Sequence, residues 1–174
     1  MKKLIFLSGP ANCGKTTTLK MLIVKLLQAG AVIEFCTRKT PTTIQSLQNE
    51  IINAIQNKNS STDIIIIVKL NNVKIGIRTL GDTIGSIWDN VWFFENKNCD
   101  IGVSACHPEH LKRSMPCIAA PWDCKKVIDK NKASNASAYY QENDAAAQIL
   151  FDIIINTVNC IALSTTSVNQ ISNP

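Results

Sequence analysis

The residues best suited to chemistry lie near the start of the chain, in the segment SGPANCGKTTT at positions 8–18. Two glycines enclose four residues and are followed by Lys15 and Thr16, which matches the pattern G-x-x-x-x-G-K-[ST] at every position. Glycines let the backbone turn its N–H groups toward phosphate oxygens, and the positive end of a following helix adds to the attraction. The pattern predicts a nucleotide-binding loop made of Gly9, Pro10, Ala11, Asn12, Cys13, Gly14, Lys15, Thr16 and Thr17.

Two residues of this loop have distinct predicted roles. Lys15 would reach the outer phosphates of a nucleoside triphosphate, and the hydroxyl of Thr16 would bind Mg²⁺. The alternative is a simple glycine turn with a solvated lysine. The complete match, together with an apolar run before the loop and a helical pattern after it, favours the phosphate site.

The first elements along the chain fit this interpretation. Residues 3–8 form an apolar run typical of a buried parallel strand. Helical spacing follows in Leu19, Leu22, Ile23, Leu26 and Leu27, and Gly30 supplies a stop signal. Residues 31–37 predict a second strand, and an amphipathic helix is expected after Pro41.

The middle of the chain predicts a different connection. Two β-branched runs flank Asn71-Asn72, a pair that tolerates the left-handed backbone angles of tight turns, so we expect an antiparallel hairpin over about 63–79. A third helix is expected over 84–94, strands over 99–106 and 115–122, and a last helix over 139–158.

Strands that alternate with helices predict an α/β fold of three layers, with a mostly parallel central sheet and the one antiparallel hairpin. Residues 1–163 would form a single nucleotide-binding domain, and residues 164–174 a polar C-terminal tail. Ligands of such sheets bind at the carboxyl ends of the strands, where the glycine loop is expected.

With these features the chain resembles the P-loop nucleoside triphosphatase superfamily. The resemblance implies a second acidic residue that holds Mg²⁺ at the end of a neighbouring strand, and Asp82 is the candidate. The run Asp82-Thr83-Ile84-Gly85 is similar to the D-x-x-G element of small GTPases, which implies that the Gly85 amide senses the terminal phosphate. The alternative role of Asp82 is a helix N-cap.

The base and the reaction are less clearly encoded. The N-K-x-D motif with which such GTPases read guanine is absent, so ATP is favoured over GTP as the cofactor beside Mg²⁺. No glutamate directly follows Asp82 to orient water, and Glu34 is a weak substitute. Arg78 and Arg113 are candidates to stabilise charge, with a plain surface position as the alternative. An ATPase or nucleotide-dependent switch, completed by a protein partner, fits what is missing.

A kinase is the main alternative, because CTRKTPTT at 36–43 resembles the Thr-Arg-Lys-x-Pro stretch of guanylate kinases. That resemblance implies that Arg38 binds the phosphate of an acceptor through its planar guanidinium group. The alternative is that Arg38 is a solvated loop residue that binds no ligand. A GTPase and a nucleotide-binding subunit without catalysis also stay open. Lys15, Asp82 and Arg38 are therefore the catalytic candidates.

Composition limits the remaining classes. The 174 residues carry a net charge of +5 without dense basic clusters, so a nucleic-acid surface is not predicted. Seven cysteines and no secretory leader indicate reduced thiols and a cytoplasmic protein, and no membrane segment is expected. The spacing of Cys106, His107, His110, Cys117 and Cys124 does not match a familiar zinc site. Oligomeric state is not encoded.

Overall fold

The structure is a computed structural model that describes residues 2–37, 42–57, 63–118, 122, 124–131 and 136–169. It is an α/β fold with a six-stranded mixed sheet in the order β2-β3-β4-β5-β1-β6. The strands are β1 (Lys3–Ser8), β2 (Val32–Cys36), β3 (Ile65–Leu70), β4 (Val73–Arg78), β5 (Ile101–Cys106) and β6 (Cys124–Asp129). The helices are α1 (Lys15–Gln28), α2 (Ile44–Asn57), α3 (Ile84–Asn96), α4 (Pro108–Ser114) and α5 (Ala136–Asn169), with a short 3₁₀ helix at Met115–Cys117.

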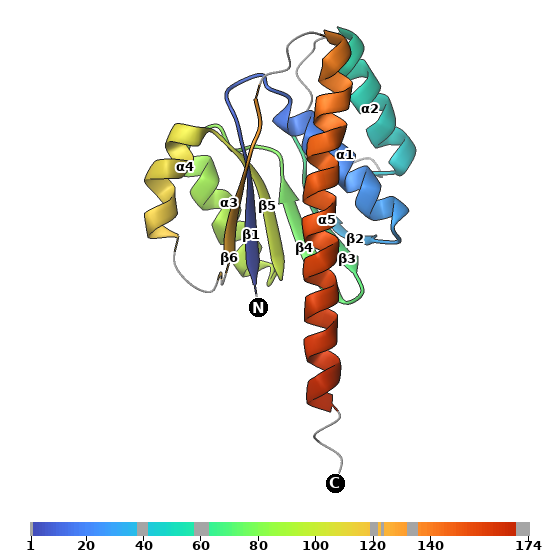
Figure 1. The fold of residues 1–174 in the computed structure, drawn as a ribbon, viewed down its shortest axis with the longest axis vertical. Coiled ribbons are helices and arrows are strands. Elements are labelled where there is room, and N and C mark those ends of the chain that lie inside the picture. The colour runs from blue at the N-terminus through green and yellow to red at the C-terminus, as the bar shows by residue number, and fades with distance from the viewer. Residues whose placement is uncertain are drawn as a thin grey trace.

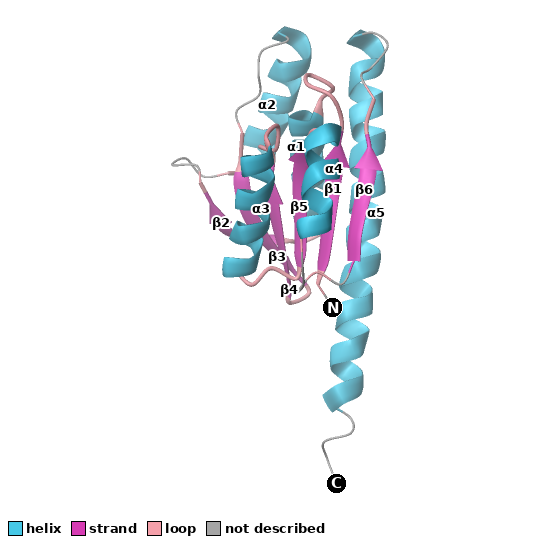
Figure 2. Ribbon diagram, turned by 90° about the vertical axis from the view of Figure 1, so that its left-hand side faces the viewer, coloured by secondary structure: helices cyan, strands magenta, loops and turns pink. Residues whose placement is uncertain are grey.

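Helices cover both faces of the sheet, as the three-layer prediction requires (Figures 1 and 2). One layer contains α1, α2 and α5, and the other contains α3 and α4. The alternation of β1 explains this arrangement, since Ile5 and Leu7 enter the core beneath α1 and α5 whereas Leu4 and Phe6 enter the core beneath α3. All four side chains are fully buried, so both faces of β1 are covered by helices.

The predicted hairpin is confirmed. Strands β3 and β4 pair antiparallel from Ile65 opposite Arg78 to Leu70 opposite Val73. Asn71 and Asn72 form the turn with positive φ angles of 49° and 65°, as expected of a two-residue hairpin turn. Because β3 also pairs antiparallel with β2, it alone runs against the other strands, and its first residue lies at the edge of the sheet where they end.

The last predicted strand was placed wrongly. Residues 115–117 form a 3₁₀ helix that contains Pro116, and the strand begins only at Cys124. This strand, β6, pairs in parallel with β1 at the edge of the sheet. Its exposed Lys126 conceals the strand pattern in the sequence, and lysines are typical of edge strands because they discourage pairing with other chains.

The last helix is longer than predicted. α5 continues to Asn169, so the first part of the expected tail over 164–174 is helical. An 18-residue window within Ala138–Ser164 has a mean hydropathy of 1.7, with 28% of it buried, and this stretch could cross a membrane by length and composition alone. In the fold, however, Leu150, Ile154 and Val158 of this helix are buried in the core beside α1. A single helix of this kind among the described residues is weak evidence for a membrane span.

Candidate active site

The glycine loop, residues 9–14, connects β1 to α1 at the carboxyl end of β1, as predicted. Asn12 and Gly14 have positive φ angles of 59° and 92°, which turn the backbone sharply into the helix. Gly14 is the N-cap residue of α1, and no side chain caps this helix. The first turn therefore keeps N–H groups that a phosphate can use as donors.

Both glycines of the motif are required by their surroundings. A Cβ atom at Gly9 would lie 2.5 Å from the carbonyl oxygen of Lys130 and 2.6 Å from Cys13 Sγ. At Gly14 it would lie 2.3 Å from Asn143 Oδ1, in addition to the strained φ angle. The loop is thus held closely between β6 and α5, and neither position accepts a side chain.

Lys15 is nearly buried, with 7% of its surface exposed, and its ammonium group lies against the glycine loop. Nζ donates hydrogen bonds of 2.8 Å to the carbonyl oxygens of Gly9 and Pro10. It also lies 3.3 Å from Oδ1 of Asp82. The loop therefore concentrates the positive charge of Lys15 at its mouth, beside a carboxylate.

Asp82 reaches this position from a strand that is not next to β1. It follows β4, and β5 lies between β4 and β1, whereas the sequence predicted a neighbouring strand. Gly81 makes the crossing over β5 feasible, since a Cβ atom there would lie 1.6 Å from the carbonyl oxygen of Ala105. The N–H of His107 donates to the carbonyl of Gly81 at 3.2 Å and fixes the crossing segment.

Asp82 is not the N-cap of the following helix. That role belongs to Thr83, whose hydroxyl accepts a hydrogen bond from the Ser86 N–H in a capping box. The Asp82 side chain is 62% exposed and free to turn toward a ligand. Gly85 lies in the first turn of α3, where an added Cβ atom would meet the Thr83 hydroxyl oxygen at an ordinary contact distance of 3.9 Å, so packing does not explain this glycine.

The sequence analysis missed an acidic residue at the same edge. Oδ1 of Asp63 lies 3.5 Å from the Thr16 hydroxyl, which donates toward it, and accepts a 2.8 Å hydrogen bond from the Thr79 hydroxyl. The resemblance to P-loop proteins implies an acidic residue after a strand, and Asp63 stands before one. Asp63 precedes β3, and because β3 is reversed, its start meets the ends of the parallel strands. The predicted hairpin already implied that one of its strands runs in reverse and starts at this edge.

Of the other candidates, Glu34 and Arg78 have partners away from the glycine loop. Arg38 lies outside the described residues. Glu34 pairs with Lys74 at 3.3 Å near the hairpin turn, at the opposite edge of the sheet, so its proposed role in orienting water is wrong. Arg78 donates to the carbonyl of Asp89 in α3, and burial lowers the pKa of its guanidinium. Arg113 is an exposed residue of α4.

Histidines and cysteines follow β5. His107 precedes α4 without a side-chain capping bond, and its ring centroid lies 5.3 Å from that of His110. The Nδ1 atoms of both rings are buried without a hydrogen-bond partner in the described part of the chain. Five cysteines there are free, and no group of three His, Cys, Asp or Glu side chains there could hold a metal ion.

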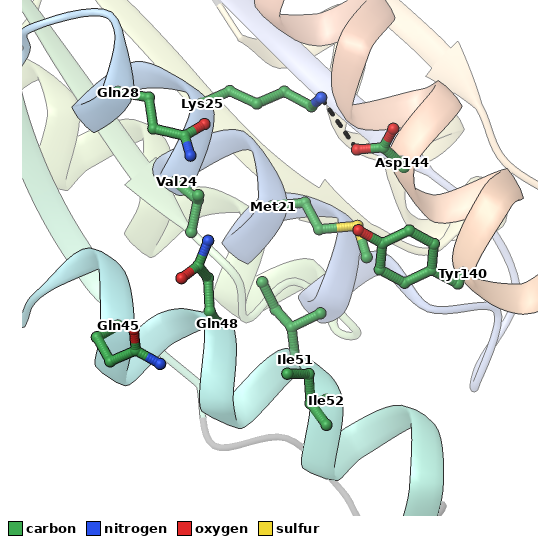
Figure 3. Close-up of a pocket in the computed structure, with 10 residues that line it drawn as sticks. All are labelled: Met21, Val24, Lys25, Gln28, Gln45, Gln48, Ile51, Ile52, Tyr140 and Asp144. Atoms are coloured by element: carbon green, nitrogen blue, oxygen red, sulfur yellow. Dashed lines mark ion pairs between the residues drawn. The ribbon is translucent and has the colours of Figure 1, made fainter.

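A shallow groove of about 570 Å³ lies elsewhere, between α1, α2 and α5 (Figure 3). Met21, Val24 and Ile51 supply apolar surface, and an ion pair of 3.0 Å between Lys25 and Asp144 crosses one side. None of the residues that line this groove belongs to the glycine loop, so it is separate from the candidate site.

No family model, curated protein or solved structure matches this chain. A function must therefore be inferred from the chemistry of the site itself. An uncapped helix start and the ammonium group of Lys15 suit an anion with several oxygens. The Thr16 hydroxyl, the carboxylate of Asp63 beside it and the carboxylate of Asp82 beside Lys15 are oxygen ligands of the kind that Mg²⁺ prefers.

Proposed function

We propose that the protein is a Mg²⁺-dependent, ATP-binding P-loop nucleoside triphosphatase that hydrolyses ATP or acts as a nucleotide-dependent switch. The observation that carries this proposal is the 3.3 Å approach of Lys15 Nζ to Asp82 at the uncapped start of α1. In a simple glycine turn with a solvated lysine, neither the burial of Lys15 nor its contact with a carboxylate that follows β4 would be expected.

In the proposed complex, Lys15 leaves the carbonyl oxygens of Gly9 and Pro10 and neutralises charge on the outer phosphates. The N–H groups at residues 11–17 would surround the inner phosphates, because Pro10 has no N–H and the Gly9 N–H donates to the carbonyl oxygen of Cys106. Thr16 and Asp82 would hold Mg²⁺, which supplies positive charge to the oxygens of the transferred phosphoryl group. The Gly85 amide, in the first turn of α3, would respond to the terminal phosphate and link it to the position of that helix.

Three alternatives remain within the proposal. A kinase similar to guanylate kinases would depend on Arg38. A GTPase would need a guanine-reading group other than N-K-x-D. A nucleotide-binding subunit would leave catalysis to a protein partner, and such a partner would also supply the water-orienting group that an ATPase needs. A cytoplasmic location is proposed from the unpaired cysteines.

Incubation with γ-labelled ATP, Mg²⁺ and a panel of nucleosides and nucleotides tests the function. Release of labelled phosphate supports the triphosphatase, and a labelled acceptor would replace it with the kinase. Binding of ATP by calorimetry without any turnover would indicate the non-catalytic subunit. If wild type and Lys15→Ala show the same absence of ATP and GTP binding, the proposal is wrong.

A further inference from the structure

We propose that Asp63 is the residue that positions Mg²⁺ on Thr16, so that the metal site depends on two carboxylates from the two ends of the hairpin. This inference rests on the proposed nucleotide site and adds a residue that no sequence motif marks. Asp63 acts through the Thr16 hydroxyl and is thus a positioning residue.

The direction of the hydrogen bond from Thr16 is the first reason. Thr16 Oγ1 donates its proton toward Asp63 Oδ1 at 3.5 Å, which leaves the lone pairs of the hydroxyl oxygen for a metal ion. A carboxylate that accepts from a metal ligand fixes the orientation of that ligand and raises its basicity. If the hydroxyl proton of Thr16 rotated toward the metal ion, it would repel the ion. The hydrogen bond to Asp63 disfavours that rotation.

The anchoring of Asp63 is the second reason. Its side chain is exposed, yet Oδ1 accepts a 2.8 Å hydrogen bond from Thr79, which is 97% buried. The Thr79 hydroxyl oxygen in turn accepts from the N–H of Ile64 at 2.9 Å. The buried Thr79 thus holds the exposed carboxylate of Asp63 beside Thr16.

The local charge is the third reason. Asp82 lies against Lys15, and Asp63 lies against Thr16, the next residue along α1. The two carboxylates offset the positive charge of Lys15 and repel the phosphates of a nucleotide that arrives without a cation, although Lys130 also lies against the glycine loop. A divalent cation between the carboxylates and the phosphates reverses this repulsion. The structure thus favours a site that accepts ATP together with its metal ion.

The test measures how strongly Mg²⁺ improves ATP binding, taken as the ratio of the Kd for ATP in EDTA to that in Mg²⁺. Asp63→Asn should lower this ratio about ten- to a hundredfold. In EDTA the same variant should bind ATP at least as tightly as wild type, because a repulsive charge is gone. A loss of structure would weaken binding under both conditions, so the two effects are distinguishable.

Variants at Thr79 test the anchor. Thr79→Val removes the hydroxyl and should lower the ratio in the same direction as Asp63→Asn, whereas Thr79→Ser should restore it. Asp152→Asn, a matched change on the exposed side of α5, should leave the ratio at the wild-type value. Electron paramagnetic resonance of Mn²⁺ with ATP gives an independent readout of metal affinity, and thermal unfolding shows whether each variant is folded.

The outcomes separate the two proposals. If Asp63→Asn retains the wild-type ratio while Asp82→Asn lowers it, the inference about Asp63 is overturned and the proposed function stands. If wild type binds neither ATP nor GTP in the presence of Mg²⁺, the proposed function fails and takes the role of Asp63 with it.

Discussion

The Nζ atom of Lys15 lies 3.3 Å from Oδ1 of Asp82, although β5 separates the strands that precede these two residues. Lys15 also holds the carbonyl oxygens of Gly9 and Pro10. The ammonium group thus has three oxygen partners before any ligand arrives. A nucleotide must replace these partners with its own phosphate oxygens. Substitution of Lys15 should therefore lower the affinity for ATP.

Lys15→Ala should weaken ATP binding by about a hundredfold or more, equivalent to about 2.7 kcal/mol, because it removes a charge-assisted contact to the phosphates. The fold should persist, since the carboxylate left behind at Asp82 is mostly exposed to water. Calorimetric titration with Mg²⁺ and ATP measures the loss, and circular dichroism checks the fold. Lys25→Ala, which removes a lysine of the same helix outside the loop, is the matched control. Equal affinities for the two variants would contradict a phosphate role for Lys15.

Asp82→Asn should raise the Mg²⁺ concentration needed for turnover and lower turnover by orders of magnitude, because the amide lacks the charge that attracts the metal. Stability should change by less than about 0.5 kcal/mol, since Asp82 does not cap α3. Thr83→Ala is the informative comparison: it removes the observed cap and should cost about 1 kcal/mol without changing the metal requirement. The measurement is the rate of phosphate release as a function of Mg²⁺ concentration. Superimposable curves for Asp82→Asn and wild type would refute the metal role of Asp82.

Two glycines of the segment after β4 should respond oppositely to alanine. Gly81→Ala places a Cβ atom 1.6 Å from the Ala105 carbonyl oxygen, so the crossing segment must move at a cost of about 1–3 kcal/mol or more. Gly85→Ala makes only an ordinary contact of 3.9 Å with the Thr83 hydroxyl oxygen and should stabilise the helix by up to about 1 kcal/mol. Urea unfolding measures both changes.

The second of these variants also tests the Gly85 amide. Alanine keeps the N–H but adds a methyl group beside it. If that amide lies close to the terminal phosphate, the methyl group of Gly85→Ala should crowd the phosphate and weaken the preference for ATP over ADP while the protein becomes more stable. A more stable variant with an unchanged preference would show that Gly85 is only a surface residue of α3.

Alkaline pH should destabilise the protein through two buried thiols. Cys99 and Cys106 are fully buried, and burial raises the pKa of each from 9.0 to about 12. The folded protein keeps these protons between pH 9 and 12, while the unfolded chain loses them and thus binds fewer protons. The stabilisation is complete below about pH 9 and declines as the pH rises toward 12, by about 1.4 kcal/mol per pH unit for each thiol.

Urea unfolding of wild type and Cys99→Ala at pH 8 and pH 10.5 measures this decline. The variant should start less stable because a small cavity replaces the thiol, but its stability should fall less steeply with pH. Parallel lines for the two proteins would mean that the Cys99 thiol titrates normally in the folded state.

Much of the fold was predictable because local chemistry determined it. The complete glycine pattern placed the loop between a strand and a helix, and Asn71-Asn72 encoded the hairpin turn through their tolerance of positive φ. β6 was not predictable from apolar spacing, since its lysines replace apolar residues at an exposed edge. The end of α5 was missed because the Ser- and Thr-rich sequence after Leu163 resembles a loose tail.

The site was only half predictable for a different reason. Lys15 and Thr16 belong to one continuous motif, whereas the contacts of Asp63 and Asp82 depend on strand order and direction. No local pattern states that β5 lies between β4 and β1, or that Gly81 permits the chain to cross over it. The contact between Asp63 and Thr16 joins residues that are 47 positions apart, so it appears only once the sheet is assembled.

The reversed direction of β3 has a consequence for the order in which the protein assembles. Asp63 and Asp82 lie at the two ends of one continuous hairpin, and the hydrogen bond between Asp63 and Thr79 spans only 16 positions. Contacts between nearby residues close with a small loss of chain entropy, so the hairpin should form earlier than the parallel pairings around β1. The acidic half of the site would then exist as a local unit before the glycine loop docks against it.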